Sequence, residues 1–174
     1  MKKILLVIDM QNDFISGALG SDEAERVIDN AVKVIDEFDG DVYVTLDTHD
    51  EGYMETNEGK NLPVPHCIKG TDGWMIESRI REALDRKGFT AIEKNTFASL
   101  ELPKLLAERY DISDTKFELI GLCTDICIIS NALLLKANFP EADISVLSFC
   151  CAGVTPKKHE AAIETMKSCQ INII

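Results

Sequence analysis

Three residues that can take part in catalysis each come after a short apolar run. Asp9 follows ILLVI, Lys94 follows FTAIE, and Cys127 comes shortly after KFELIG. A carboxylate beside a thiol can remove its proton and later return a proton to the leaving group, and an ammonium stabilises the thiolate. These residue types therefore suit nucleophilic catalysis by the thiol, with Asp9 as the base.

Each of the three residues also has a purely structural interpretation. Cysteine is most often a small buried core residue, an aspartate after a strand often caps a loop, and most lysines are exposed. The argument for catalysis at Cys127 is local, because Thr124 and Asp125 are typical helix-capping residues. They predict that Cys127 lies in the first turn of a helix, where the dipole stabilises a thiolate. From these residues alone, both interpretations stay open.

A second group of residues has the types that bind metal ions. Asp47 and His49 follow the apolar run DVYVTL, and on an extended segment their side chains point the same way. His66 lies later in the same irregular stretch, residues 47–73, and a stretch of that length is usually functional. Two histidines with one or two carboxylates can bind zinc, iron or manganese. An Asp-x-His pair alone is a weak signal, so an ordinary loop remains the alternative.

The elements that must position these residues are predicted strands and helices, which alternate along the chain. The strand-like runs cover residues 4–8, 41–46, 89–93, 116–121, 143–148 and 171–174. Apolar residues at helical spacing cover 27–38, 74–84, 102–110, 126–137 and 156–166. Ser21 with Asp22, and Thr155 with Pro156, are suitable helix starts. The alternation predicts one α/β domain over residues 1–174, with three layers and a mainly parallel sheet of about six strands. The candidate residues then meet at the carboxyl ends of the strands.

Composition excludes several classes of function. The formal net charge is −12 and no cluster of lysine and arginine occurs, which excludes nucleic acid as a partner. No apolar run approaches the roughly 20 residues of a membrane span, so no membrane partner is expected. The segment MKKILLVIDMQNDF is interpreted as a strand rather than a signal peptide, because Asp9 interrupts its apolar run. We therefore expect a cytoplasmic protein whose six cysteines are reduced.

Five segments, in order and over nearly the whole chain, carry a resemblance to a known family. They are LLVIDMQNDF, TLDTH with LPVPHCIKGT, IEKNTFAS, GLCTDICI and AGVTPKKHEAAIETM. Together they resemble the isochorismatase-like cysteine hydrolases and, within them, the nicotinamidases or pyrazinamidases. The resemblance implies a hydrolase acting on the carbon–nitrogen bond of a linear amide. The small-molecule substrate would be nicotinamide, converted to nicotinate and ammonia through a cysteine thioester in NAD salvage.

The resemblance also implies roles for particular residues. Asp9, Lys94 and Cys127 would form the catalytic triad. A non-proline cis peptide between Leu122 and Cys123 would turn the backbone amides of Cys123 and Cys127 into an oxyanion hole. This assignment makes Cys127 the nucleophile and leaves Cys123 a role through its backbone.

A metal site and a substrate pocket are implied in the same way. One divalent ion, zinc first and iron or manganese as alternatives, would be held by Asp47, His49, Glu58 and His66. Glu58 would take the place of a further histidine that many family members have. Phe14, Phe97 and Leu122 would bind the substrate. A tryptophan common before the Pro-x-His segment is replaced by Leu62 and Pro63, which leaves the identity of the amide open.

Two other kinds of protein remain as alternatives. One is another enzyme of the family, either an amidase for ureido or carbamoyl compounds or an isochorismatase. Neither obviously needs Asp47, His49 and His66 as ligands. The other is a non-catalytic protein of the same fold that binds a metal or a small molecule, in which Cys127 would be an unactivated thiol. A flavodoxin-like carrier is disfavoured, because no phosphate loop follows the first strand. Family members often self-associate, so the resemblance allows a homo-oligomer.

Overall fold

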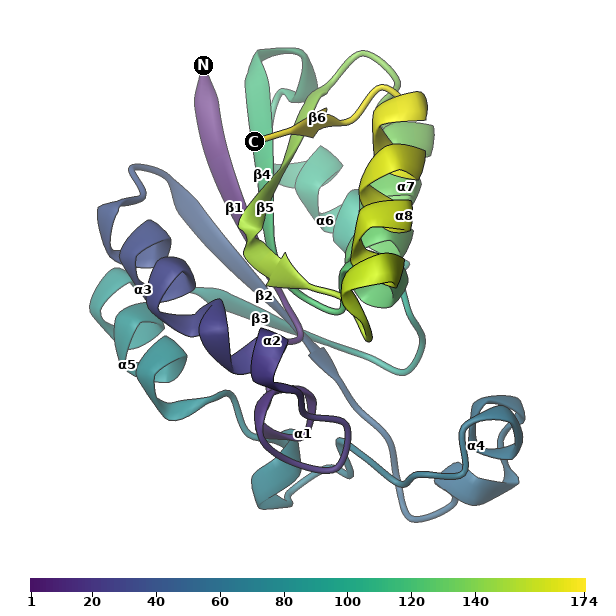
Figure 1. Cartoon of the computed structure of the whole chain (residues 1–174). Coiled ribbons are helices and arrows are strands. Elements are labelled where there is room, and N and C mark those ends of the chain that lie inside the picture. The colour runs from purple at the N-terminus through teal and green to yellow at the C-terminus, as the bar shows by residue number, and fades with distance from the viewer.

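Six strands form a single sheet in the computed structural model, which describes residues 1–174 (Figure 1). The strands are β1 (Lys2–Ile8), β2 (Asp41–Asp47), β3 (Thr90–Lys94), β4 (Thr115–Leu122), β5 (Asp143–Ala152) and β6 (Asn172–Ile173). Their order across the sheet is β3-β2-β1-β4-β5-β6, and every neighbouring pair is parallel. The predicted parallel sheet is confirmed.

Helices cover both faces of the sheet, so the predicted three layers are confirmed. The helices are α1 (Asn12–Ile15), α2 (Asp22–Arg26), α3 (Ile28–Glu37), α4 (Asn57–Asn61), α5 (Ser78–Lys87), α6 (Glu101–Arg109), α7 (Ile129–Asn138) and α8 (Pro156–Ser168). Figure 1 shows α3 and α5 on one side of the sheet, and α7 and α8 on the other. The short helix α4 stands apart from both layers. None of these helices combines the length and the apolar character that crossing a membrane requires.

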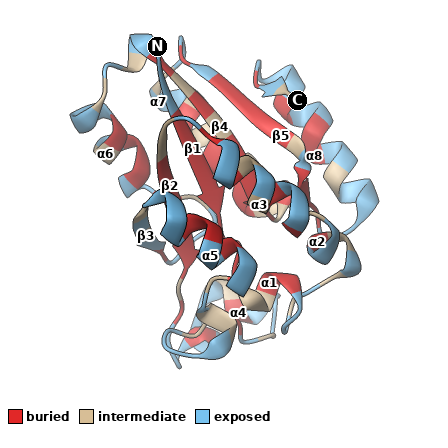
Figure 2. Cartoon of the chain, turned by 90° about the vertical axis from the view of Figure 1, so that its left-hand side faces the viewer, coloured by how far each residue is buried: buried red, intermediate tan, exposed pale blue.

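Side chains of β1 alternate between two cores, one on each face of the sheet. Leu5 and Val7 pack with apolar residues of α2, α3 and α5, whereas Ile4, Leu6 and Ile8 pack with those of α6, α7 and α8. A strand covered on both faces needs a continuous apolar run, because successive side chains point to opposite faces. Figure 2 shows the resulting pattern, with buried strands at the centre and exposed outer sides on the helices.

One predicted helix begins later than its apolar spacing indicates. Trp74 lies in a short 3₁₀ turn, and the helix α5 begins at Ser78. The carboxylate of Glu77 caps this helix, because it accepts a hydrogen bond from the backbone N–H of Ile80 at 3.0 Å. Trp74 and Ile76 therefore pack against the core, partly buried, without being helical, which spacing alone does not distinguish.

Two other segments also differ in detail from their predictions. The helical stretch after Ser21 is divided at Val27 into α2 and α3, although Ser21 caps its start as predicted and accepts a hydrogen bond from the N–H of Ala24. The irregular stretch 47–73 contains α4 and a 3₁₀ turn at Tyr53–Glu55.

The carboxyl ends of four strands converge where β1 and β4 lie side by side. Asp9 follows β1, Asp47 and Lys94 end β2 and β3, and the turn with Cys127 follows β4. Gly121 allows β4 to approach β1 here, because its φ is +127° and a Cβ would overlap the carbonyl oxygen of Ile8. The direction of the connections changes between β1 and β4, and such a switch point is where α/β sheets bind ligands.

Candidate active site

The carboxylate of Asp9 and the ammonium of Lys94 form a buried ion pair at this edge of the sheet. Lys94 Nζ lies 2.6 Å from Asp9 Oδ2 and 3.7 Å from Cys127 Sγ. Thr45 Oγ1 donates a hydrogen bond to Asp9 Oδ1 at 2.6 Å. Asp9 Oδ2 receives no hydrogen bond of good geometry, despite the nearby ammonium. The structure thus brings the three candidate catalytic residues together, with Asp9 Oδ2 held by the charge of Lys94 and not by a well-aligned hydrogen bond.

Burial dominates the electrostatics of these three residues. Burial raises the pKa of Asp9, and attraction to Lys94 offsets this only in part. Burial, with the carboxylate of Asp9, also raises the pKa of Cys127, while Lys94 acts in the opposite direction. Burial disfavours the ammonium of Lys94, but Asp9, Cys127 and Asp47 outweigh it and raise the pKa of Lys94. The thiol therefore rests with its proton, contrary to the prediction of a stabilised thiolate, and needs a base.

Cys127 lies in a π-helical turn, Thr124–Ile128, that runs directly into α7. The predicted position in the first helical turn is therefore confirmed, although the turn is π-helical and not α-helical. The peptide bond between Leu122 and Cys123 is cis, as the resemblance implies. The carbonyl of Cys123 accepts hydrogen bonds from the N–H groups of Ile126 and Ile128, each at 3.1 Å. Short π-helical turns are frequent at functional sites, and this one supports the candidate nucleophile.

Thr124 and Asp125 do not cap a helix, so that prediction is wrong. The hydroxyl of Thr124 pairs with Nδ1 of His159 in α8 at 2.8 Å. Asp125 Oδ1 accepts a hydrogen bond from the N–H of Val154 at 2.9 Å. Both side chains attach the turn to α8 and the residues before it. Spacing along the sequence did not reveal these partners, because they lie about 30 residues further along the chain.

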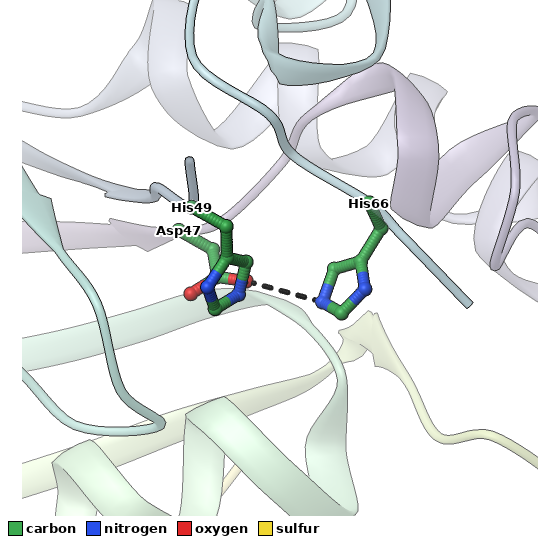
Figure 3. A group of neighbouring side chains, drawn as sticks. All are labelled: Asp47, His49 and His66. Carbon is green, nitrogen blue, oxygen red and sulfur yellow. Dashed lines mark hydrogen bonds and ion pairs between the residues drawn. The ribbon is translucent and has the colours of Figure 1, made fainter. Parts of the chain in front are cut away.

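The second group, Asp47, His49 and His66, forms a buried cluster at the end of β2 (Figure 3). Its ligand atoms all lie within 4.8 Å of one another. Asp47 Oδ2 is 3.0 Å from His49 Nε2 and 3.4 Å from His66 Nε2. Glu58 Oε1 lies 3.8 Å and 3.6 Å from the same two nitrogens, so the predicted fourth residue borders the cluster.

The donor atoms of this cluster fit a divalent metal ion. His66 Nδ1 lies 2.8 Å from the carbonyl oxygen of Val64, which places the ring hydrogen there and leaves the Nε2 lone pair facing Asp47. Two imidazole nitrogens with carboxylate oxygens suit zinc, iron or manganese. Lys94 Nζ also lies 3.3 Å from Asp47 Oδ1. The cluster therefore lies directly beside the Asp9, Lys94 and Cys127 group.

A cavity of about 770 Å³ opens beside these residues, a volume typical of small-molecule sites. It is lined by His49, Thr56, Asn57, Glu58, Asn61, Leu62, Asn95, Thr96, Phe97, Asp125, Ile126 and Ser130. Of the three predicted substrate-binding residues, Phe97 lines the cavity and is 46% exposed. Phe14 is buried, with its ring centroid 5.5 Å from that of His66. Leu122 lies in the core and is not part of the cavity wall.

Gln11 is a positioning residue that the sequence prediction missed. Its side-chain amide pairs with both backbone groups of Asp47: Nε2 donates to the carbonyl oxygen and Oε1 accepts from the N–H, each at 2.8 Å. Nε2 also donates to the carbonyl oxygen of Trp74 at 2.8 Å. Gln11 is fully buried, and these bonds hold the backbone of Asp47 at the start of the candidate metal cluster. The only signal in the sequence was an amide soon after the first strand.

Replacing Gln11 by methionine is expected to weaken zinc binding about tenfold or more, the usual effect of removing a partner that orients a ligand. Methionine has a similar length but cannot pair with the backbone of Asp47. Titration of zinc against a competing chelator measures this effect, and Gln170→Met, at an exposed glutamine, is the matched control. Unchanged zinc affinity in the Gln11 variant would contradict the positioning role.

Comparison with known proteins agrees with the resemblance of the five sequence segments. The isochorismatase domain family matches residues 3–174. The isochorismatase family protein PncA of Bacillus subtilis strain 168 is 35% identical over 146 residues, which cover 76% of this chain and 78% of that protein.

Solved structures of related proteins have the same fold over their whole length. The nicotinamidase/pyrazinamidase PncA from Bacillus subtilis matches with a TM-score of 0.87 and 28% identity, and 99% of each chain is covered. The pyrazinamidase of Pyrococcus horikoshii in complex with zinc matches with a TM-score of 0.81 and 25% identity, over 100% of this chain and 99% of that one. The chain therefore belongs to the isochorismatase family, as its sequence segments predicted.

Proposed function

We propose that the protein hydrolyses nicotinamide to nicotinate and ammonia through a thioester on Cys127. The chain is a hydrolase that acts on the carbon–nitrogen bond of a linear amide, and its structural relatives are nicotinamidases and pyrazinamidases. The observation that carries the proposal is the position of Lys94. Its ammonium lies 2.6 Å from the Asp9 carboxylate, 3.7 Å from the Cys127 thiol and 3.3 Å from Asp47, so it joins the candidate base, nucleophile and metal cluster.

Asp47, His49 and His66, with Glu58 beside them, would hold one divalent ion. Zinc is first among the candidates because two imidazoles and carboxylates are common zinc ligands, and iron or manganese would accept the same donors. When bound, the ion supplies a Lewis-acidic contact that orients the pyridine nitrogen of the substrate. Orientation of this kind can contribute several kcal/mol to catalysis.

The first half of the reaction forms the thioester. Asp9 takes the proton of Cys127 on Oδ2, the oxygen without a well-aligned hydrogen bond. The thiolate forms a bond to the carboxamide carbon, and the carbonyl electron pair moves onto oxygen. The backbone N–H groups of Cys123 and Cys127 stabilise this oxyanion, and each such donor typically contributes about 3 to 4 kcal/mol. Asp9 then gives its proton to nitrogen, the carbon–nitrogen bond breaks, and ammonia leaves.

The second half of the reaction releases the acid. Asp9 removes a proton from water, the resulting hydroxide attacks the thioester carbon, and the carbon–sulfur bond breaks. Asp9 returns its proton to the sulfur, and the acid leaves as nicotinate after losing its own proton to solvent. Lys94 keeps its charge throughout, because its raised pKa prevents loss of its proton. It compensates the negative charge that passes between Asp9 and Cys127.

Ammonia release from nicotinamide is the test of this proposal. The metal-loaded protein is expected to release ammonia, and removal of the metal with a chelator should lower the rate at least about 100-fold, with recovery when zinc is returned. Circular dichroism of the chelated protein controls for unfolding. A rate that chelation does not change would contradict the metal requirement. No release by the metal-loaded protein would favour another amide, such as a ureido or carbamoyl compound.

A further inference from the structure

The segment 95–100, between β3 and α6, lacks backbone hydrogen bonds of its own. None of its N–H or carbonyl groups takes part in a backbone–backbone hydrogen bond. Asn95, Thr96 and Phe97 of this segment nevertheless form part of the cavity wall. A wall built from such a segment needs side chains to hold it in place.

Asn131 of α7 makes two of the four side-chain hydrogen bonds that hold the segment. Its Nδ2 donates to the carbonyl oxygen of Phe97 at 3.2 Å, and its Oδ1 accepts from the N–H of Ser99 at 3.0 Å. Nδ2 also donates to the carbonyl oxygen of Cys127 at 2.8 Å. In the remaining two hydrogen bonds, Lys94 Nζ donates to the carbonyl oxygen of Thr96, and the Ser99 hydroxyl accepts from the backbone N–H of Leu102 in α6. Asn131 therefore connects the Phe97 wall directly to the turn of the candidate nucleophile.

Asparagine at position 131 has no evident advantage for the helix itself. It is a weak helix former, and it is only 1% exposed. Burying an amide is unfavourable unless its donors and acceptor find partners. Here every partner other than the Cys127 carbonyl belongs to segment 95–100. Asn131 thus serves the connection between α7 and this segment.

We propose that Asn131 is a positioning residue that holds the Phe97 wall in place and so governs how tightly the amide substrate is bound. This inference rests on the proposed function for its kinetic readout. The turn of Cys127 has its own backbone hydrogen bonds to the Cys123 carbonyl, whereas segment 95–100 has none. Loss of Asn131 therefore displaces the Phe97 wall more than the thiol, and it acts on KM more than on kcat.

The kinetic test compares Asn131→Asp, Phe97→Ala and the double variant. Aspartate keeps the acceptor for Ser99 but loses both donated hydrogen bonds. Asn131→Asp is expected to raise KM for nicotinamide about tenfold, the effect of losing a buried hydrogen bond, while kcat stays within about threefold. The double variant should resemble Phe97→Ala alone, because both changes act through the same wall. Asn131→Ala gives the same comparison without a buried charge.

Asn138→Asp is the matched control on the same helix. Asn138 Nδ2 donates to the carbonyl of Leu134 at 2.8 Å, the same spacing as the bond from Asn131 to Cys127, but Asn138 is exposed and touches no part of segment 95–100. The KM of Asn138→Asp should equal that of the wild type. The proposal would be overturned if the increase in KM of the double variant equalled the product of the increases in the two single variants. It would also be overturned if Asn131→Asp lowered kcat and left KM unchanged.

A second readout does not depend on the substrate. Chymotrypsin cleaves after exposed phenylalanine, and cleavage after Phe97 should be at least about fivefold faster in Asn131→Asp than in Asn138→Asp, because opening of the segment becomes easier. If the wild type does not hydrolyse nicotinamide, the proposed function fails while this measurement still decides the positioning role. The positioning role of Asn131 would be overturned if the two variants were cleaved after Phe97 at equal rates. It would also be overturned if Asn131→Asp were cleaved faster at sites throughout the chain.

Discussion

Replacement of Cys127 by alanine is expected to lower kcat for ammonia release by about 10⁴-fold or more, because loss of the nucleophile removes the covalent route. Cys127 Sγ is the thiol that lies within 4 Å of the Lys94 ammonium, at 3.7 Å. Metal content should stay at the wild-type level, since the side chain of Cys127 is not in the metal cluster. Initial rates of ammonia release, with metal analysis of the same sample, measure both effects.

Cys169→Ala is the control for this experiment, because Cys169 is the exposed free cysteine. It should retain the wild-type rate and the wild-type metal content. Mass spectrometry of rapidly acidified wild-type reactions should detect an acyl group on the peptide that contains Cys127. Turnover by Cys127→Ala at the wild-type rate would contradict the proposed thioester mechanism.

Asp9→Asn is expected to lower kcat about 10³-fold, within the usual contribution of a general base. Asparagine has nearly the same shape and can still accept the hydrogen bond from Thr45, but it cannot take the thiol proton. Burial raises the pKa of Asp9, and Asp9 must begin the reaction as a carboxylate. Wild-type activity should therefore fall as the pH drops through this raised pKa, and the residual activity of the variant should lack that fall.

Rates measured across the acidic pH range test this expectation. Asp39→Asn, at an exposed aspartate after α3, should keep both the rate and the pH profile of the wild type. Zinc binding by Asp9→Asn should still be measurable, which separates loss of the base from loss of the metal. If Asp9→Asn kept the wild-type kcat, another group would be the base. The same conclusion would follow if its activity fell at acidic pH in the same way as that of the wild type.

The fold could be predicted from the sequence because apolar runs and apolar spacing, the strongest signals in the sequence, are local. The run from Ile4 to Ile8 is apolar without interruption, as a strand covered on both faces requires. The start of α5 could not be placed, because Trp74 and Ile76 pack against the core from a segment that is not helical. Periodicity records which residues are buried, and it does not record whether the backbone between them is helical.

The candidate site was predictable where a residue type itself indicates chemistry. Asp47, His49 and His66 belong to types that bind metals, and the structure brings them together. Gln11 and Asn131 could not be recognised, because each binds backbone groups of a segment more than 30 residues away, which no local pattern identifies. The direction of the pKa shift at Cys127 also required the structure, since it depends on burial.

The order of the strands has a consequence for biosynthesis. One half of the sheet consists of β1, β2 and β3. The proposed base, the ammonium and the metal cluster all lie at the ends of these strands or in the segment between β2 and β3. The proposed nucleophile follows β4, which pairs with the other side of β1. During translation, residues 1–94 leave the ribosome before Cys127 does. The thiol is thus the last of these groups to be synthesised, and its partners are already present in the nascent chain when β4 adds to β1.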